Sequence, residues 1–210
     1  MIPVNTIAMV LMEDMFRCAR AHQEKSMLRV LGICGSLRKG SYNASLLRAY
    51  ADWAPPDTTI ETAHIDEIPS YNEDVRHVGF PPPVGRLRDQ IQRADALLIV
   101  TPEYNYSIPG VLKNAIDWAS RPPDQPFYEK PIAIAGASPS MLGSARAQYD
   151  LRRCCVYLNA FVLNQPEVMV AKAHDRFDKG GKLTHQGSQR LVVEQLEALA
   201  AFVERVRPRG

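Results

Sequence analysis

The sequence predicts an α/β protein in which a five-stranded parallel sheet lies between two layers of helices. Three observations predict this fold class. Five short apolar runs alternate along the chain with five segments whose apolar residues recur at helical spacing. The apolar runs are nearly continuous, which is typical of strands that are buried on both faces of a parallel sheet. With 210 residues and 46% hydrophobic residues, the chain is long enough for one well-packed domain and short for two.

The strands are expected where apolar runs are bounded by turn residues. The first run, LRVLGIC, is followed by glycine and serine, and the last run is broken by Pro166. We expect strands at residues 28–34, 58–65, 96–101, 131–137 and 162–170. Because helical segments separate these runs, the strands should run parallel and be joined by right-handed crossovers.

The helices are expected between the strands and after the last one. Three consecutive prolines precede the second helix, and Pro109 occupies the first turn of the third. We expect helices at residues 42–53, 84–93, 109–120, 143–159 and 188–206. Ligands of such sheets bind outside the carboxyl ends of the strands, so the loops after the first, third and fourth strands should converge on one site.

The loop after the first strand, GSLRKGSYN at residues 35–43, has the composition of a phosphate-binding loop at the start of a helix. Main-chain N–H groups there are unpaired and lie at the positive end of the helix dipole. Ser41 occupies the lysine position of the triphosphate-binding loop, and the glycine spacing does not fit the dinucleotide fingerprint. We therefore expect Ser36, Arg38, Ser41 and Asn43 to hold a single phosphate, unless the segment is an ordinary turn with its basic side chains in solvent.

The loop after the third strand, TPEYNYSIPG at residues 101–110, is bounded by prolines that fix local backbone angles. Its peptide groups could bond the edge of a planar heterocycle, while Tyr104 or Tyr106 covers a face. The alternative is a turn whose tyrosines pack against the next helix. Beside a phosphate loop, the heterocycle is the favoured interpretation.

The loop after the fourth strand, ASPSMLGS at residues 137–144, offers Ser138 and Ser140 as small donors, although Ser140 is comparably suited to be a helix N-cap. All five histidines lie outside the three loops, and no grouping of Ser, His and Asp follows from the spacing. We therefore expect no catalytic residue and assign the chemistry to a bound cofactor.

Charge and cysteine usage exclude several classes of protein. The net charge is +2 and the basic residues are scattered, so no nucleic-acid partner is expected. The four cysteines, at positions 18, 34, 154 and 155, lack the spacing of a metal site, and they fit a reducing, cytoplasmic compartment. Residues 1–12 are uncharged and largely apolar, but they lack a basic region and are too short to span a bilayer, which argues against a signal peptide and a membrane partner.

Three motifs together resemble the NADPH-dependent FMN reductase family of flavodoxin-like proteins, which includes bacterial quinone, chromate and azo-dye reductases. They are GSLRKGSYN at residues 35–43, PEYNYSIPGVLKNAIDWAS at 102–120 and ASPSMLGSARAQ at 137–148. The resemblance implies a flavodoxin-like three-layer sandwich, with an FMN-binding reductase domain at residues 27–210. Residues 1–26 fall outside it as an N-terminal extension of uncertain structure, either an added helix or the result of an upstream start.

The resemblance also implies which residues contact FMN. The phosphate would be held by Ser36, Arg38, Ser41, Tyr42 and Asn43. The isoalloxazine would be lined by Pro102, Glu103, Tyr104, Asn105, Tyr106 and Ser107. Within that set, Glu103, Tyr104 and Asn105 would contact its polar edge, and Ser138 would approach from the third loop.

The implied activity is a ping-pong reaction in which NADPH or NADH passes a hydride to FMN, which then reduces a quinone-like or other small acceptor. The implied assembly is a homodimer or homotetramer, with each flavin near a subunit interface. Two alternatives stay open, a flavodoxin-type electron carrier with a protein partner and a flavin-binding sensor. The slightly basic charge and Arg38 argue against the carrier, because such carriers are generally acidic and use a Thr-rich phosphate loop.

Overall fold

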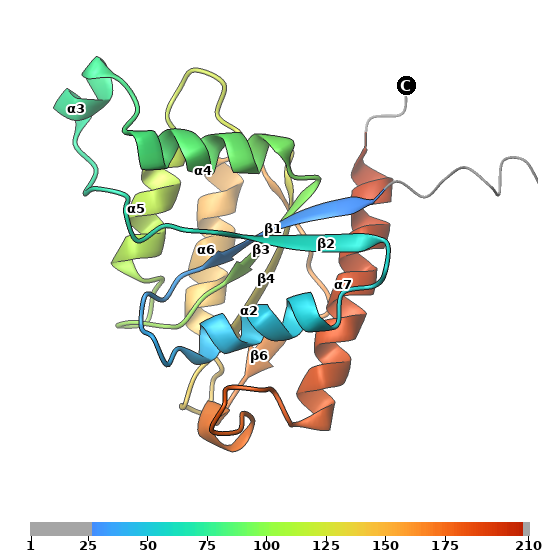
Figure 1. The fold of residues 1–210 in the computed structure, drawn as a ribbon. Helices are drawn as coiled ribbons and strands as arrows, with labels where there is room; N and C mark the ends of the chain where they lie inside the picture. Colours follow the sequence, from blue (N-terminus) through green and yellow to red (C-terminus); the bar gives the residue numbers. More distant parts are fainter. Residues whose placement is uncertain (1–26, 208–210) are drawn as a thin grey trace, which may run out of the picture.

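The computed structural model describes residues 27–207, so the expectation about residues 1–26 lies outside the described part. The strands are β1 Leu28–Cys34, β2 Thr58–Ala63, β3 Ala96–Val100, β4 Pro131–Ala137, β5 Phe161–Val162 and β6 Val168–Val170. The helices are α2 Tyr42–Asp52, α3 Glu73–Val78, α4 Pro82–Arg93, α5 Gly110–Ala119, α6 Ala145–Tyr157 and α7 Gln186–Val206, with a 3₁₀ turn at Ala173–Asp175. The alternating order confirms the predicted α/β class (Figure 1).

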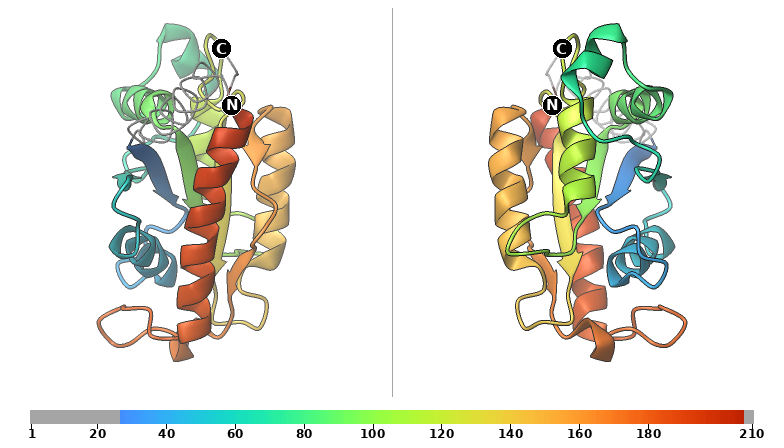
Figure 2. Two further views of the ribbon diagram at one scale, coloured as in Figure 1. Left: turned by 90° about the vertical axis from the view of Figure 1, so that its right-hand side faces the viewer. Right: turned by 90° about the vertical axis from the view of Figure 1, so that its left-hand side faces the viewer.

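The strands form one parallel sheet in the order β2-β1-β3-β4-β5, and β6 pairs with β4 beyond β5. Helices α2 and α7 cover one face, and α4, α5 and α6 cover the other, which gives three layers (Figure 2). Since the chain moves outward from β1 to β2 and then crosses to β3, the strand order reverses between β1 and β3. A crevice at this reversal is where ligands of open α/β sheets bind.

The expected fifth strand at residues 162–170 is wrong as a single strand. It divides into β5 and β6 on either side of Pro166, which has no N–H to donate to the ladder. The buried Gln195 of α7 bridges this break, because its Nε2 donates to Pro166 O at 2.7 Å and to Ile134 O at 3.2 Å. Its Oε1 accepts from the buried hydroxyl of Tyr50, so one side chain joins α2, β4, α7 and the break.

Helix α3 was not predicted, because none of its residues is buried and it therefore leaves no apolar stripe. Local signals specify it instead. The Asn72 side chain accepts from Asp74 N at 2.8 Å as the N-cap, Glu73 and Asp74 occupy the first turn, and Gly79 ends the helix with φ 151°.

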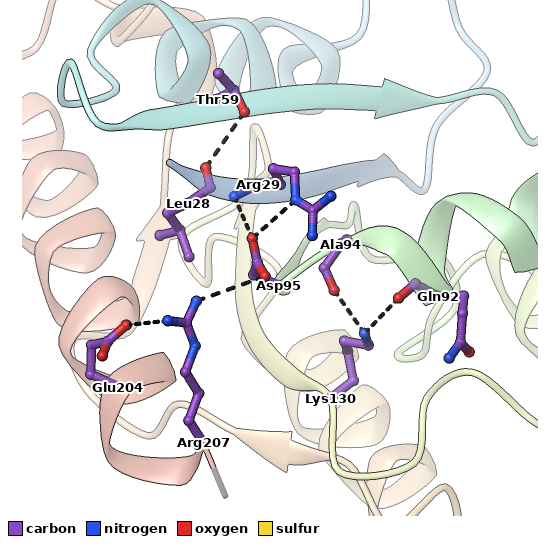
Figure 3. A network of polar contacts seen from close by, with 9 residues as sticks. All are labelled: Leu28, Arg29, Thr59, Gln92, Ala94, Asp95, Lys130, Glu204 and Arg207. Atoms are coloured by element: carbon purple, nitrogen blue, oxygen red, sulfur yellow. Dashed lines mark hydrogen bonds and ion pairs between the residues drawn. The ribbon is translucent and has the colours of Figure 1, made fainter. Parts of the chain in front are cut away.

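Polar contacts tie the amino-terminal edge of the sheet together (Figure 3). The Asp95 carboxylate accepts from Arg29 N at 2.9 Å and Arg29 Nε at 3.3 Å, and it lies 3.8 Å from Arg207 at the end of α7. Lys130 Nζ donates to carbonyls at the end of α4, at 2.7 Å from the O of the C-cap residue Ala94 and 3.4 Å from Gln92 O. Desolvation by burial lowers the pKa of this lysine. The contacts satisfy helix ends and a strand start, so this edge is structural.

Candidate functional site

The loop between β1 and α2 presents unpaired main-chain donors. Ser41 is the N-cap of α2, and its Oγ accepts from Asn43 N at 3.2 Å and Ala44 N at 3.3 Å. Within the described residues 27–207, the N–H groups of residues 36–40 donate no hydrogen bond. They surround the positive end of α2, where an anion gains both hydrogen bonds and a favourable field.

Arg38 is held beside these donors. Its Nη2 donates to Gly40 O at 2.6 Å, and its guanidinium lies 5.6 Å from the centroid of the Tyr42 ring. The other partner of Tyr42 is Phe177, with ring centroids 5.6 Å apart. Tyr42 therefore lies between Arg38 and the segment that precedes α7, and its side chain positions the cation.

Asn43 has a different position from the one expected for a phosphate ligand. Its side chain is buried, with Nδ2 donating to Ala137 O at 2.9 Å and Oδ1 accepting from Ala137 N at 2.9 Å. Both ends of the amide are thus used to join the first turn of α2 to the last residue of β4. The contact fixes the first loop against the third.

The loop after β3 is a tight hairpin. Tyr104 and Ser107 exchange two main-chain hydrogen bonds, each 3.0 Å long, and Asn105 and Tyr106 between them have φ 51° and 70°. Two central residues with positive φ are the mark of a type I′ turn, a conformation that costs energy for residues other than glycine. The loop at residues 101–110, which we call the arch, therefore owes its shape to this turn as well as to the flanking prolines.

Arg146 of α6 fastens the arch, and the sequence analysis did not single it out. The Glu103 carboxylate, 8% exposed, pairs with the Arg146 guanidinium and accepts from Arg146 N at 3.1 Å. The guanidinium also lies 3.5 Å from the centroid of the Tyr106 ring. The hydrogen bond with Glu103 raises the pKa of Arg146. Arg146 lies within the motif ASPSMLGSARAQ, but only the fold brings it to Glu103, 43 positions away.

The third loop is held by hydrogen bonds between its own serines and to the segment around β6. Ser138 Oγ donates to Ser140 Oγ at 2.9 Å and accepts from Ser140 N at 3.1 Å, while Ser138 N donates to Val170 O at 3.0 Å. Ser140 is not the helix N-cap, since α6 begins after Ser144. The Ser138 and Ser140 carbonyls accept from residues 173 and 172, so the segment after β6 lies along this loop.

The three loops lie at one edge of the sheet, as the sequence predicted. Gly35 N donates to Val100 O at 2.8 Å, and Thr101 N donates to Ala135 O at 2.9 Å, so each strand end is bonded to the next. The main-chain N–H groups after β1 and the arch after β3 therefore lie on either side of the point where the strand order reverses. The partly buried Cys34 adds no nucleophile, because desolvation by burial raises the pKa of its thiol.

Arg146→Ala is expected to weaken binding of the FMN that the sequence resemblance implies, because it removes both the partner of the Glu103 carboxylate and the cation over Tyr106. Isothermal titration of the flavin-free protein with FMN measures the effect. Arg153→Ala, on an exposed position of the same helix, is the matched control. Equal FMN affinities for the two variants would show that the arch keeps its shape without Arg146.

Comparison with known proteins identifies the family of this chain. The family model for NADPH-dependent FMN reductases matches residues 28–175, which include all three loops. An NAD(P)H-dependent FMN reductase of Pseudomonas aeruginosa is 56% identical over 180 residues, covering 86% of this chain and 97% of the relative. A quinone reductase of Escherichia coli K12 is 44% identical over 183 residues, again covering 86% and 97% of the two chains.

A solved structure agrees with these relatives. The flavoenzyme NAD(P)H:(acceptor) oxidoreductase FerB from Paracoccus denitrificans superimposes with a TM-score of 0.78 at 34% identity, and the match covers 85% of this chain and 98% of that one. The predicted family and the flavodoxin-like fold are thereby confirmed. The chain belongs to the NADPH-dependent FMN reductase family and is an FMN- and NAD(P)H-dependent oxidoreductase.

Proposed function

We propose that the protein binds FMN across the β1 and β3 strand ends and uses it to reduce quinone-like small acceptors with NAD(P)H. The observation that carries this proposal is the occurrence of two features at one edge of the sheet. N–H groups that donate no hydrogen bond within residues 27–207 precede α2, and a tight hairpin follows β3. The first feature suits a single phosphate, and the second suits the edge of a planar ring. The quinone reductases among the relatives support the acceptor class.

The residues present fit FMN, with changed roles for Tyr42, Asn43 and Glu103 relative to the sequence expectation. Ser36, Arg38 and Ser41 border the unpaired donors and are assigned to the phosphate. Tyr42 and Asn43 are assigned positioning roles, because their side chains already contact Phe177 and Ala137. The ring is assigned to Pro102, Glu103, Tyr104, Asn105, Tyr106 and Ser107, with Ser138 beside it. Because the Glu103 carboxylate is engaged by Arg146, we assign ring contacts to the main chain of Glu103.

When bound, FMN supplies the hydride chemistry, accepting from the nucleotide and donating to the acceptor. The chain's own residues bind the cofactor and orient it. Main-chain donors and Arg38 fix the phosphate end, the arch fixes the ring edge, and the exposed rings of Tyr104 and Tyr106 border the space where a flat acceptor can stack. The arch carries one carboxylate, that of Glu103, and this carboxylate is engaged by the Arg146 guanidinium.

Assembly and location complete the proposal. Exposed apolar side chains gather on the outer side of α6 and the loop before it: Met141, Leu142, Tyr149, Val156 and Tyr157. A surface of this kind favours a homodimer or homotetramer with the arch near the interface, which light scattering of the purified protein tests. Between residues 27 and 207, no helix combines the length and apolar character needed to cross a membrane. Free thiols at Cys34, Cys154 and Cys155 support a cytoplasmic location.

The function is tested by mixing the purified, FMN-loaded protein with NADH or NADPH and a panel of quinone, chromate, azo and ferric acceptors. We expect the flavin absorbance to bleach with the nucleotide and to return with a quinone. Protein that neither carries nor binds FMN would overturn the proposal. Bound FMN that stays oxidised until a partner reductase is added would favour the flavodoxin-type electron carrier.

Arg38→Ala is expected to weaken FMN binding by about 1.5–3 kcal/mol, or roughly 10- to 150-fold in Kd, because a charge-assisted phosphate contact is lost. Fluorescence titration of the flavin-free variant gives the Kd. Lys39→Ala is the control, since it removes the same charge from the next residue of the same loop. A loss shared equally by both variants would mean that only the net charge of the loop matters.

A further inference from the structure

A polar cavity lies along α2, lined by residues outside the three loops that follow β1, β3 and β4. Its volume is about 450 Å³. One wall is a single face of α2, with Ser45, Arg48 and Asp52 one turn apart, and Trp53 stands at the end of the helix. The opposite wall is the hairpin formed by residues 180–183.

The hairpin is built to approach α2 closely. Phe177 and Leu183 form an antiparallel bridge, and Gly181 N donates to Asp178 O at 3.0 Å across the turn. Gly181 has φ +80°, and a Cβ there would lie 2.7 Å from Ser45 Oγ and 3.0 Å from Arg48 Nη2. Only glycine both adopts this backbone and leaves room for the helix. The cavity therefore has a defined wall rather than a loose surface loop.

The cavity adjoins the phosphate loop. Ser45 is one helical turn, about 6 Å, from the N-cap Ser41. The same hairpin segment contacts that loop, because the Phe177 ring lies against Tyr42. A ligand that begins on the flavin and passes its phosphate end can thus continue along α2 without leaving the surface.

The lining has the chemistry of a nucleotide site. Arg48 Nη2 donates to Ser45 Oγ at 2.8 Å, which holds the guanidinium at the wall of the cavity. In the described part of the chain, the Lys182 side chain has no hydrogen bond or ion pair. Two cations and a hydroxyl suit a phosphate, an indole suits stacking on a purine, and the Asp52 carboxylate can accept from hydroxyl or amino groups. Trp53 also borders a second cavity, of about 610 Å³, at the start of α7, so its ring has open space beside it.

We propose that this groove binds the adenosine half of NADPH, with the 2′-phosphate between Arg48 and Lys182 and the adenine against Trp53. The proposal rests on the proposed function, since the nicotinamide half must reach the flavin. It deepens that function by assigning the residues that distinguish NADPH from NADH, because NADH lacks the phosphate that the two cations would hold.

The test uses the FMN-loaded protein and titration with adenosine 2′,5′-bisphosphate, followed by tryptophan fluorescence. Trp118 is fully buried, so quenching reports on the half-buried Trp53, and Trp53→Phe should remove the signal. We expect saturable quenching, and binding of ADP about tenfold weaker or worse because it lacks the 2′-phosphate. Absence of saturable quenching, or equal affinity for the two nucleotides, would overturn the proposal.

A matched pair of variants makes the test specific. Lys182→Ala is expected to weaken adenosine 2′,5′-bisphosphate binding and to raise KM for NADPH, each by about tenfold, while KM for NADH is unchanged. Lys179→Ala removes the same charge from the same segment but outside the cavity, and should change neither. Equal effects of the two variants would mean that the nucleotide is attracted only by the general positive charge of the segment, and would overturn the proposed site. If NADPH bleaches the flavin but the bisphosphate does not bind, the proposed function stands and this site fails.

Discussion

Gly136→Ala is expected to lower the free energy of unfolding by about 3 kcal/mol, at the upper end of the usual cost of overpacking. Gly136 lies inside β4, where an added Cβ would come within 1.9 Å of Ser144 Oγ and 2.4 Å of Thr101 O. The second atom belongs to the main chain, so a rotamer change cannot relieve the contact. Thr101 begins the arch and Ser144 precedes α6, so the methyl group would also separate the two elements that Glu103 and Arg146 join.

Two measurements check this expectation. Urea denaturation gives the loss of stability, and titration with FMN gives an accompanying loss of affinity. Gly85→Ala is the control, because Gly85 lies within α4 and, apart from the adjacent backbone of its own helix, no atom of the described residues lies within 4 Å of an added Cβ. This change should stabilise the protein by roughly 0.5–1 kcal/mol. Gly136→Ala with unaltered stability would mean that the close approach of β3, β4 and α6 is not required.

A double variant separates the two contacts. Ser144 has φ 70°, a conformation that glycine adopts readily, so Ser144→Gly alone should be tolerated. In the Gly136→Ala background it removes the hydroxyl at 1.9 Å but leaves Thr101 O at 2.4 Å. We therefore expect partial rescue and clear non-additivity, since residues in contact do not contribute independently. Full additivity of the two changes in unfolding free energy would mean that the contact with the Ser144 hydroxyl does not cause the loss of stability.

The sheet was predictable because a strand that is buried on both faces appears in the sequence as a nearly continuous run of apolar residues. All five residues of β3 and all seven of β4 are buried. Where burial does not drive the structure, the prediction failed. Helix α3 buries no residue. The break between β5 and β6 depends on Gln195 of α7, whose side chain donates a hydrogen bond to the Pro166 carbonyl in the break. Neither leaves a periodic pattern near its own position.

The site divides in the same way. Its loops could be predicted from the sequence, because strand ends, glycines and a helix start are local features. The roles of single side chains could not, because they depend on long-range partners. Glu103 meets Arg146, and Asn43 meets Ala137, only after the strands are placed side by side. The type I′ turn at Asn105 and Tyr106 could not be predicted either, because its sequence lacks the glycine that usually marks such a turn.

Asn43→Ala is expected to destabilise the protein by about 1–3 kcal/mol for each main-chain group of Ala137 that it leaves buried and unpaired. The residue is 3% exposed, and both hydrogen bonds are 2.9 Å long. The first turn of α2 would lose its attachment to β4, so the phosphate loop would move relative to the third loop. FMN affinity should fall together with stability.

Asn43→Asp distinguishes positioning from direct phosphate contact. The carboxylate can still accept from Ala137 N, but it faces Ala137 O with no proton to donate, so the pair would repel until the acid is protonated. Burial near a carbonyl raises the pKa of such an acid above its unfolded value, so the variant should be more stable at low pH and should lose stability as pH rises through the raised pKa. Denaturation midpoints at several pH values, compared with the parent protein, measure this trend. A variant that keeps parent stability at every pH, yet loses FMN, would instead make Asn43 a direct ligand of the phosphate.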